Sequence, residues 1–137
     1  DLDREPKWVT AAYDGALWAR STLPADAILA MKDTGTFGYF SDSRVVNLDG
    51  LVNSWEYQEV LKRQGLNDYL GEKGVGYLVE HAAPVSAETQ DFRMKYVSHL
   101  HDCLSDEIAL NPERLVYWRE YTLSGQTYGF GVWRLTP

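Results

Sequence analysis

The chain has 137 residues, of which 45% are hydrophobic and 13% aromatic, so it can bury a core and does not belong to the disordered class. Its formal net charge is −7 and its thirteen Lys and Arg residues are scattered, which excludes a basic surface for nucleic-acid phosphates. Cys103 is the only cysteine, so no internal disulfide can form, and no apolar run suits a membrane helix or a signal peptide. These bounds predict one soluble domain over residues 1–137.

Helices and strands are predicted in alternation over the first 80 residues. Residues 6–21 carry apolar side chains at three- and four-residue steps, which indicates an amphipathic helix. Residues 34–40 are too short and too rich in glycine for more than a loop or one helical turn. Asn53 or Ser54 can cap a further helix. The later predicted helices are 55–64 and 66–72, and the predicted strands are 27–32, 44–48 and 75–80.

The second half ends in a predicted β-hairpin. Residues 115–122 and 127–135 are rich in Tyr, Trp and Val, and Ser124-Gly125 between them favours a turn. Before this hairpin, the spacing of apolar residues over 92–103 hints at a helix. The predicted fold class is therefore α/β: a layered sandwich whose mainly parallel, Rossmann-like sheet is extended by the antiparallel C-terminal hairpin.

Polar loops follow two of the predicted strands. Asp33 comes directly after residues 27–32, and Asn47 and Asp49 lie at the end of residues 44–48. If these strands are parallel neighbours, both loops emerge at the carboxyl edge of the sheet, where open α/β sheets bind ligands. The residues of this candidate ligand crevice are Asp33, Gly35, Tyr39, Asn47, Asp49 and Asn53. The alternative, which we favour, is that the Asp residues accept backbone hydrogen bonds and the glycines permit turns.

The triplet Asp33-Thr34-Gly35 also matches the signature of aspartic proteases. Such an enzyme needs two carboxylates that share a proton, the second supplied by a repeat or by a twin chain. The triplet occurs once, and an aromatic hairpin occupies the place where a viral-type protease has a glycine-flanked element and a final helix. A hydrolase that uses Asp33 as acid or base therefore ranks last among the functions considered.

His99, His101 and Cys103 occupy alternate positions, so on a strand they would share one face and could hold zinc. The spacing of Phe92, Tyr96, His99 and Cys103 favours a helix instead. On a helix, His101 points away from the other two residues. The spacing matches no zinc-ligand signature, and the sequence has no P-loop, dinucleotide fingerprint or nucleophile elbow. We expect no metal ion, no cofactor and no catalytic residue in this chain.

Three strings of residues carry a family resemblance that covers about residues 8–80. They are Leu23-Pro24-x-Asp26-Ala27, Asp33-x-Gly35-x-x-Gly38-Tyr39-Phe40-Ser41 and Val45-Val46-Asn47-Leu48-Asp49-Gly50-Leu51-Val52-Asn53. This part of the chain resembles the soluble region that follows the membrane helices in many bacterial polytopic glycosyltransferases of the GT-C class.

The resemblance implies a parent enzyme that uses a polyprenyl phosphate sugar on the extracytoplasmic, periplasmic face of the bacterial inner membrane. The acidic residues that contact metal or acceptor in such enzymes lie between membrane helices, so no catalytic residue is transferred to this chain. It implies a non-catalytic accessory domain, inactive alone, that assists positioning of the acceptor or the lipid-linked sugar. Its partners would be the parent's own transmembrane region and a sugar or lipid-linked sugar.

The chain begins at Asp1 without a Met, which fits a piece of a longer membrane protein. The alternative function is a free-standing module that binds a small ligand at the crevice of Asp33 and Asp49.

Overall fold

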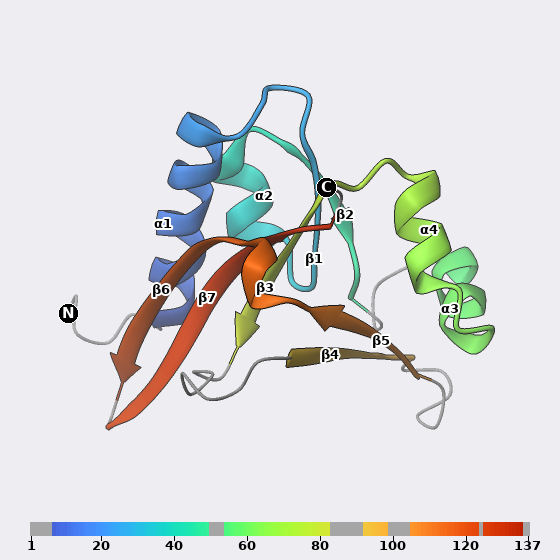
Figure 1. The fold of residues 1–137 in the computed structure, drawn as a ribbon. Helices are drawn as coiled ribbons and strands as arrows, with labels where there is room; N and C mark the ends of the chain where they lie inside the picture. Colours follow the sequence, from blue (N-terminus) through green and yellow to red (C-terminus); the bar gives the residue numbers. More distant parts are fainter. Residues whose placement is uncertain (1–6, 50–53, 83–91, 99–104, 124, 136–137) are drawn as a thin grey trace.

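The computed structural model describes residues 7–49, 54–82, 92–98, 105–123 and 125–135 (Figure 1). A five-stranded sheet has the order β2-β1-β3-β7-β6, and β4 and β5 form a separate two-stranded sheet. The strands are β1 (Ile28–Met31), β2 (Arg44–Asn47), β3 (Tyr77–Ala82), β4 (Phe92–Val97), β5 (Ser105–Leu110), β6 (Leu115–Leu123) and β7 (Gln126–Arg134). The helices are α1 (Lys7–Thr22), α2 (Gly35–Ser41), α3 (Trp55–Lys62), α4 (Leu66–Glu72) and the 3-10 helix η2 (Pro112–Arg114).

The large sheet is mixed, so the predicted mainly parallel, Rossmann-like sandwich is wrong. β1 pairs in parallel with β2 and β3, whereas β7 pairs antiparallel with β3 and β6. β4 and β5 also pair antiparallel. A parallel neighbour requires a long crossover connection, and two strands joined by a tight turn can pair only antiparallel. The predicted C-terminal hairpin is present as β6 and β7, and it supplies the antiparallel half of the large sheet.

Residues 92–97 form strand β4, so the helix suggested over 92–103 is wrong for this described part. Met94, Tyr96 and Ser98 point inward while the alternate residues are exposed, which is the two-residue period of a strand. A spacing of four residues, as between Phe92 and Tyr96, suits both a helix turn and one face of a strand. The sequence pattern therefore could not separate the two structures here.

Segment 34–40 also differs from its prediction, because a seven-residue helix, α2, occupies Gly35–Ser41. The helix ends at Ser41, and its C-cap residue, Asp42, has a left-handed φ of 54°. Phe37 is fully buried between this helix and the sheet, and this contact stabilises a segment that local propensity alone leaves as a loop.

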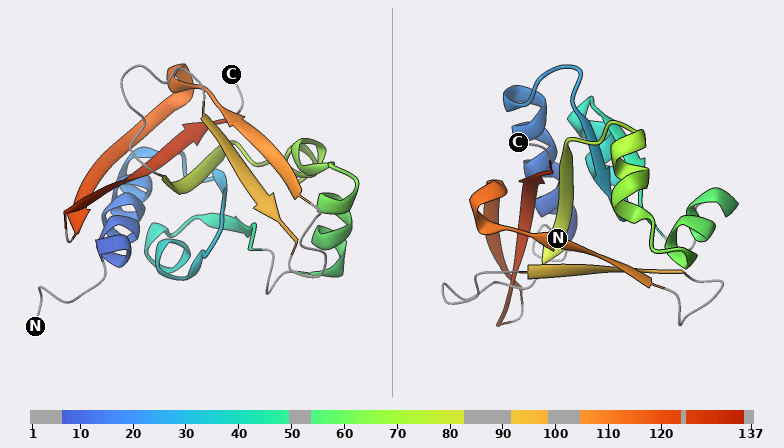
Figure 2. Two further views of the ribbon diagram at one scale, coloured as in Figure 1. Left: turned by 90° about the horizontal axis from the view of Figure 1, so that it is seen from below. Right: turned by 45° about the vertical axis from the view of Figure 1, so that its right-hand side comes forward.

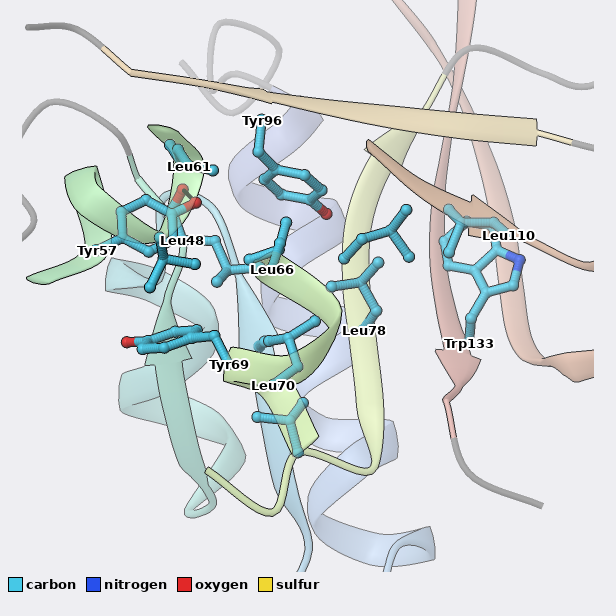
Figure 3. Packing of buried hydrophobic residues seen from close by; sticks show 14 of the residues in the cluster. Leu48, Tyr57, Leu61, Leu66, Tyr69, Leu70, Leu78, Tyr96, Leu110 and Trp133 are labelled. Atoms are coloured by element: carbon cyan, nitrogen blue, oxygen red, sulfur yellow. Dashed lines mark hydrogen bonds between the residues drawn. The ribbon is translucent and has the colours of Figure 1, made fainter. Parts of the chain in front are cut away.

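The large sheet lies between two layers (Figures 1 and 2). Along β1, Leu29 and Met31 face α1 and α2, and Ala30 faces the opposite layer of α3, α4, β4 and β5. On that second side, Leu78 of β3 packs among the inner side chains of α4, including Leu66 (Figure 3). Each layer closes one hydrophobic core against the sheet.

Small residues on α1 allow the helix to approach the sheet closely. Ala11, Ala16 and Ala19 are buried in the interface, and Gly15 lies directly against the ring of Phe130 on β7. A Cβ atom at residue 15 would lie 2.3 Å from Cε1 of that ring, closer than real contacts allow. The sequence of α1 therefore sets the distance between this helix and the sheet.

Candidate functional site

Parallel pairing brings three of the predicted crevice residues to one edge of the large sheet. Met31 of β1 is in register with Asn47 of β2, and the backbone N–H of Leu48 donates to the Met31 carbonyl at 2.9 Å. Asp33 and Asp49 lie two residues beyond these paired strand ends. The edge predicted from the sequence therefore exists.

At this edge, the polar side chains shape the turns. Asp33 is exposed and has a φ of 49°, in the left-handed region that few side chains other than Asn and Asp occupy. The Asn47 Oδ1 atom accepts a hydrogen bond from the backbone N–H of Asp49 at 2.8 Å, which is the geometry of an Asx turn. These contacts assign a structural role to Asp33 and Asn47 as corners of the loops.

Gly35 and Tyr39 belong to α2, the helix that follows the corner at Asp33. Gly35 is the first residue of the helix. The Tyr39 ring contacts the Phe40 ring at 4.9 Å between centroids, and Phe40 contacts Tyr13 of α1 at the same distance. Tyr39 is thus part of an aromatic surface over α1 and α2. Asn53 lies outside the described residues.

That surface is larger than these three rings. Val9, Tyr13 and Leu17 follow at four-residue steps along α1, so they form one row on the helix. Their side chains are 37%, 40% and 40% exposed, and Tyr39 is 82% exposed. Together with Phe40 these residues form what we call the α1/α2 apolar face.

A buried carboxyl group at the same sheet edge was not predicted from the sequence. Glu80 of β3 is 3% exposed and accepts a hydrogen bond from the Tyr96 hydroxyl of β4. Burial raises the pKa of Glu80 to about 7, while the Tyr96 hydrogen bond and the charge of Lys32 lower it. The one signal in the sequence is a charged residue within the apolar run of residues 77–82.

Lys32 completes this arrangement from the end of β1. Its Nζ atom lies 4.4 Å from the centroid of the Tyr96 ring and donates to the Lys95 carbonyl at 2.8 Å. The ammonium group therefore attaches β4 to the large sheet through both a ring and a backbone contact.

Two further hydrogen bonds join the β4–β5 pair to the helices of its layer. The Ser98 hydroxyl donates to Gln58 Oε1 of α3 at 2.5 Å, and the backbone N–H of Leu66 at the start of α4 donates to Asp106 Oδ2 at 2.9 Å.

A carboxyl group with a pKa near neutrality, such as that of Glu80, can exchange a proton at physiological pH. Because Glu80 is covered and bonded to Tyr96, its position suits attachment of β4–β5 better than contact with a substrate.

His81 follows Glu80 and points to the α1/α2 side. Its ring lies edge-on to Phe130 at 4.9 Å between centroids, and its buried Nδ1 atom has no hydrogen-bond partner among the described residues. Burial lowers the pKa of His81, and the charge of Asp33 opposes this effect. The imidazole is therefore held mainly by apolar contacts.

No group of three His, Cys, Asp or Glu residues suited to a metal ion occurs within the described ranges. His99, His101 and Cys103, which the sequence raised as a zinc site, lie outside those ranges. Among the described helices, none has both the length and the apolar character needed to cross a membrane.

The structure therefore defines a domain with a mixed central sheet, one helical layer, and one layer of helices and the antiparallel β4–β5 pair. The model of a domain of unknown function, DUF8728, matches residues 6–131, so the chain belongs to this family. No curated protein and no solved structure gives a significant match to the chain.

Proposed function

We propose that this chain is a non-catalytic accessory domain of a bacterial membrane glycosyltransferase that uses a polyprenyl phosphate sugar. The domain lies on the periplasmic face of the inner membrane and assists positioning of the acceptor or the lipid-linked sugar. The proposal starts from the sequence resemblance of residues 8–80 to the soluble region of GT-C enzymes.

The α1/α2 apolar face is the observation that carries the proposal. The string Gly38-Tyr39-Phe40-Ser41, which is part of the resemblance, places two aromatic side chains on this face. Tyr39 is 82% exposed, and the row of Val9, Tyr13 and Leu17 lies on the neighbouring helix. Contiguous exposed apolar patches mark sites that contact another protein, a membrane or a ligand. In this proposal the partner is the parent's own transmembrane region.

The chemistry of the sheet edge supports a non-catalytic role. Asp33 and Asn47 shape turns, and Glu80 is sealed beneath Tyr96. These three side chains therefore have structural roles at this edge. Reacting groups would belong to the membrane region of the parent enzyme.

The test uses the full-length protein in membrane vesicles and a radiolabelled polyprenyl phosphate sugar as donor. The full reading frame should contain apolar segments of membrane-spanning length before Asp1, about 20 residues each. Tyr39→Ser should lower sugar transfer several-fold, because it removes an aromatic contact of the docked face. Trp55→Ser is the matched control, since Trp55 is 66% exposed on α3 in the opposite layer.

Two outcomes would contradict the proposal. One is a reading frame that starts close to Asp1, which would leave a free-standing ligand-binding module as the better hypothesis. The other is equal sugar transfer by the Tyr39→Ser and Trp55→Ser variants.

A further inference from the structure

A pocket of about 250 Å³ lies between α4, β5 and the end of β7. It sits beside Val75, at the amino end of β3, and is therefore at the sheet edge opposite to Asp33 and Asn47. Its apolar wall includes Leu70, Ile108 and Trp133. The pocket is separate from both the polar sheet edge and the α1/α2 apolar face.

Two polar side chains of this pocket, Arg114 and Asn111, offer hydrogen-bond donors. One guanidinium N–H of Arg114 donates to the Leu135 carbonyl at 2.7 Å, which fixes this side chain in the wall. A guanidinium has five N–H donors, of which this hydrogen bond uses one. The Asn111 Oδ1 atom accepts from the backbone N–H of Glu113 at 2.9 Å, which leaves its NH2 group as a donor.

The ionisable side chains that line the pocket, Arg114 and Arg134, are both cationic. None of the twelve described residues that line the pocket is Asp or Glu, although the chain has a net charge of −7. Within the described part of the chain, Arg114 forms no ion pair. An arginine that is held in place beside apolar side chains, with no carboxylate of its own, favours an anion with planar oxygens.

We propose that this pocket binds a small carboxylate with an apolar body. Arg114 pairs with the carboxylate, and Leu70, Ile108 and Trp133 contact the body. At about 30 Å³ of liquid volume per water, the pocket holds on the order of eight waters, which is room for one six-membered ring with its carboxylate. Free phosphate would engage the arginine but leave the apolar wall uncovered.

The experiment uses the chain as it is, with benzoate as the probe and NMR signals of the Trp133 indole and the Leu135 amide as reporters. Benzoate should shift both signals in a saturable way. Benzamide, which keeps the ring and lacks the charge, and inorganic phosphate, which lacks the ring, should each bind at least about tenfold more weakly. This comparison needs no variant and so does not depend on the folding of a mutant.

A variant pair adds a second measurement. Arg114→Gln should weaken benzoate binding about tenfold or more, whereas Arg44→Gln, an exposed arginine on β2, should leave it unchanged. Absence of saturable benzoate shifts would overturn the proposal, and so would equal binding of benzamide or of phosphate. No membrane component is present in this assay, so its result is independent of the proposed glycosyltransferase role.

Discussion

Replacement of the buried Glu80 by Gln should make the protein markedly more stable at pH 8 and leave its stability nearly unchanged near pH 4.5. Glutamine has almost the shape of the protonated acid and keeps an oxygen that can accept the Tyr96 hydrogen bond. Unlike the carboxyl group, it never acquires a charge. The variant therefore isolates the cost of ionising Glu80 inside the core.

The size of the effect follows from the pKa. Burial raises the pKa of Glu80 from 4.5 to about 7 in the folded protein. The folded state then holds this proton more tightly than the unfolded state, so the resulting stability is fully present below about pH 4.5 and is lost as the pH rises through 7. At about 1.4 kcal/mol per pH unit, the free energy of unfolding falls by about 3 kcal/mol through this group.

The assay is urea unfolding at several pH values between 4.5 and 8, followed by tryptophan fluorescence. The difference in unfolding free energy between Glu80→Gln and the native protein should grow by about 3 kcal/mol over this range. Glu72→Gln is the matched control, because Glu72 is exposed at the end of α4. A difference that stays constant with pH would refute the reasoning, since it would mean that the pKa of Glu80 is the same in the folded and unfolded states.

Two further predictions concern backbone positions. Gly15→Ala should lower the free energy of unfolding by about 1–3 kcal/mol, because its Cβ would displace the Phe130 ring. Gly71→Ala in α4 should raise the free energy of unfolding by up to about 1 kcal/mol, because a Cβ there meets no atom within 4 Å. Thermal unfolding by circular dichroism measures both, and a Gly15→Ala variant at least as stable as Gly71→Ala would contradict the close approach of α1. Asp33→Val should be less stable than Asp33→Gly by about 1–2 kcal/mol, because a β-branched residue is strained at a φ of 49°. Equal urea midpoints for these two variants would show that residue 33 does not need a left-handed conformation.

Local patterns in the sequence were sufficient for several elements. The helix predicted at 6–21 is α1, the hairpin predicted at 115–135 is β6 and β7, and Ser54 caps α3 by accepting from the Tyr57 N–H at 3.3 Å. The sequence also predicted that Asp33 and Asn47 would share a sheet edge if β1 and β2 were parallel neighbours, and the structure supplies that pairing. Periodicity, caps and turn residues act within a few positions along the chain, so one sequence is enough to recognise them.

Strand direction and the chemistry of the site were decided by tertiary structure. β7 pairs with β3, which precedes it by about fifty residues, and nothing local to either strand specifies that the pairing is antiparallel. The raised pKa of Glu80 likewise depends on Tyr96 from another strand closing over it, and the position of Arg114 depends on the Leu135 carbonyl. Burial and long-range hydrogen bonds depend on which segments meet in space, and local sequence patterns do not specify those contacts.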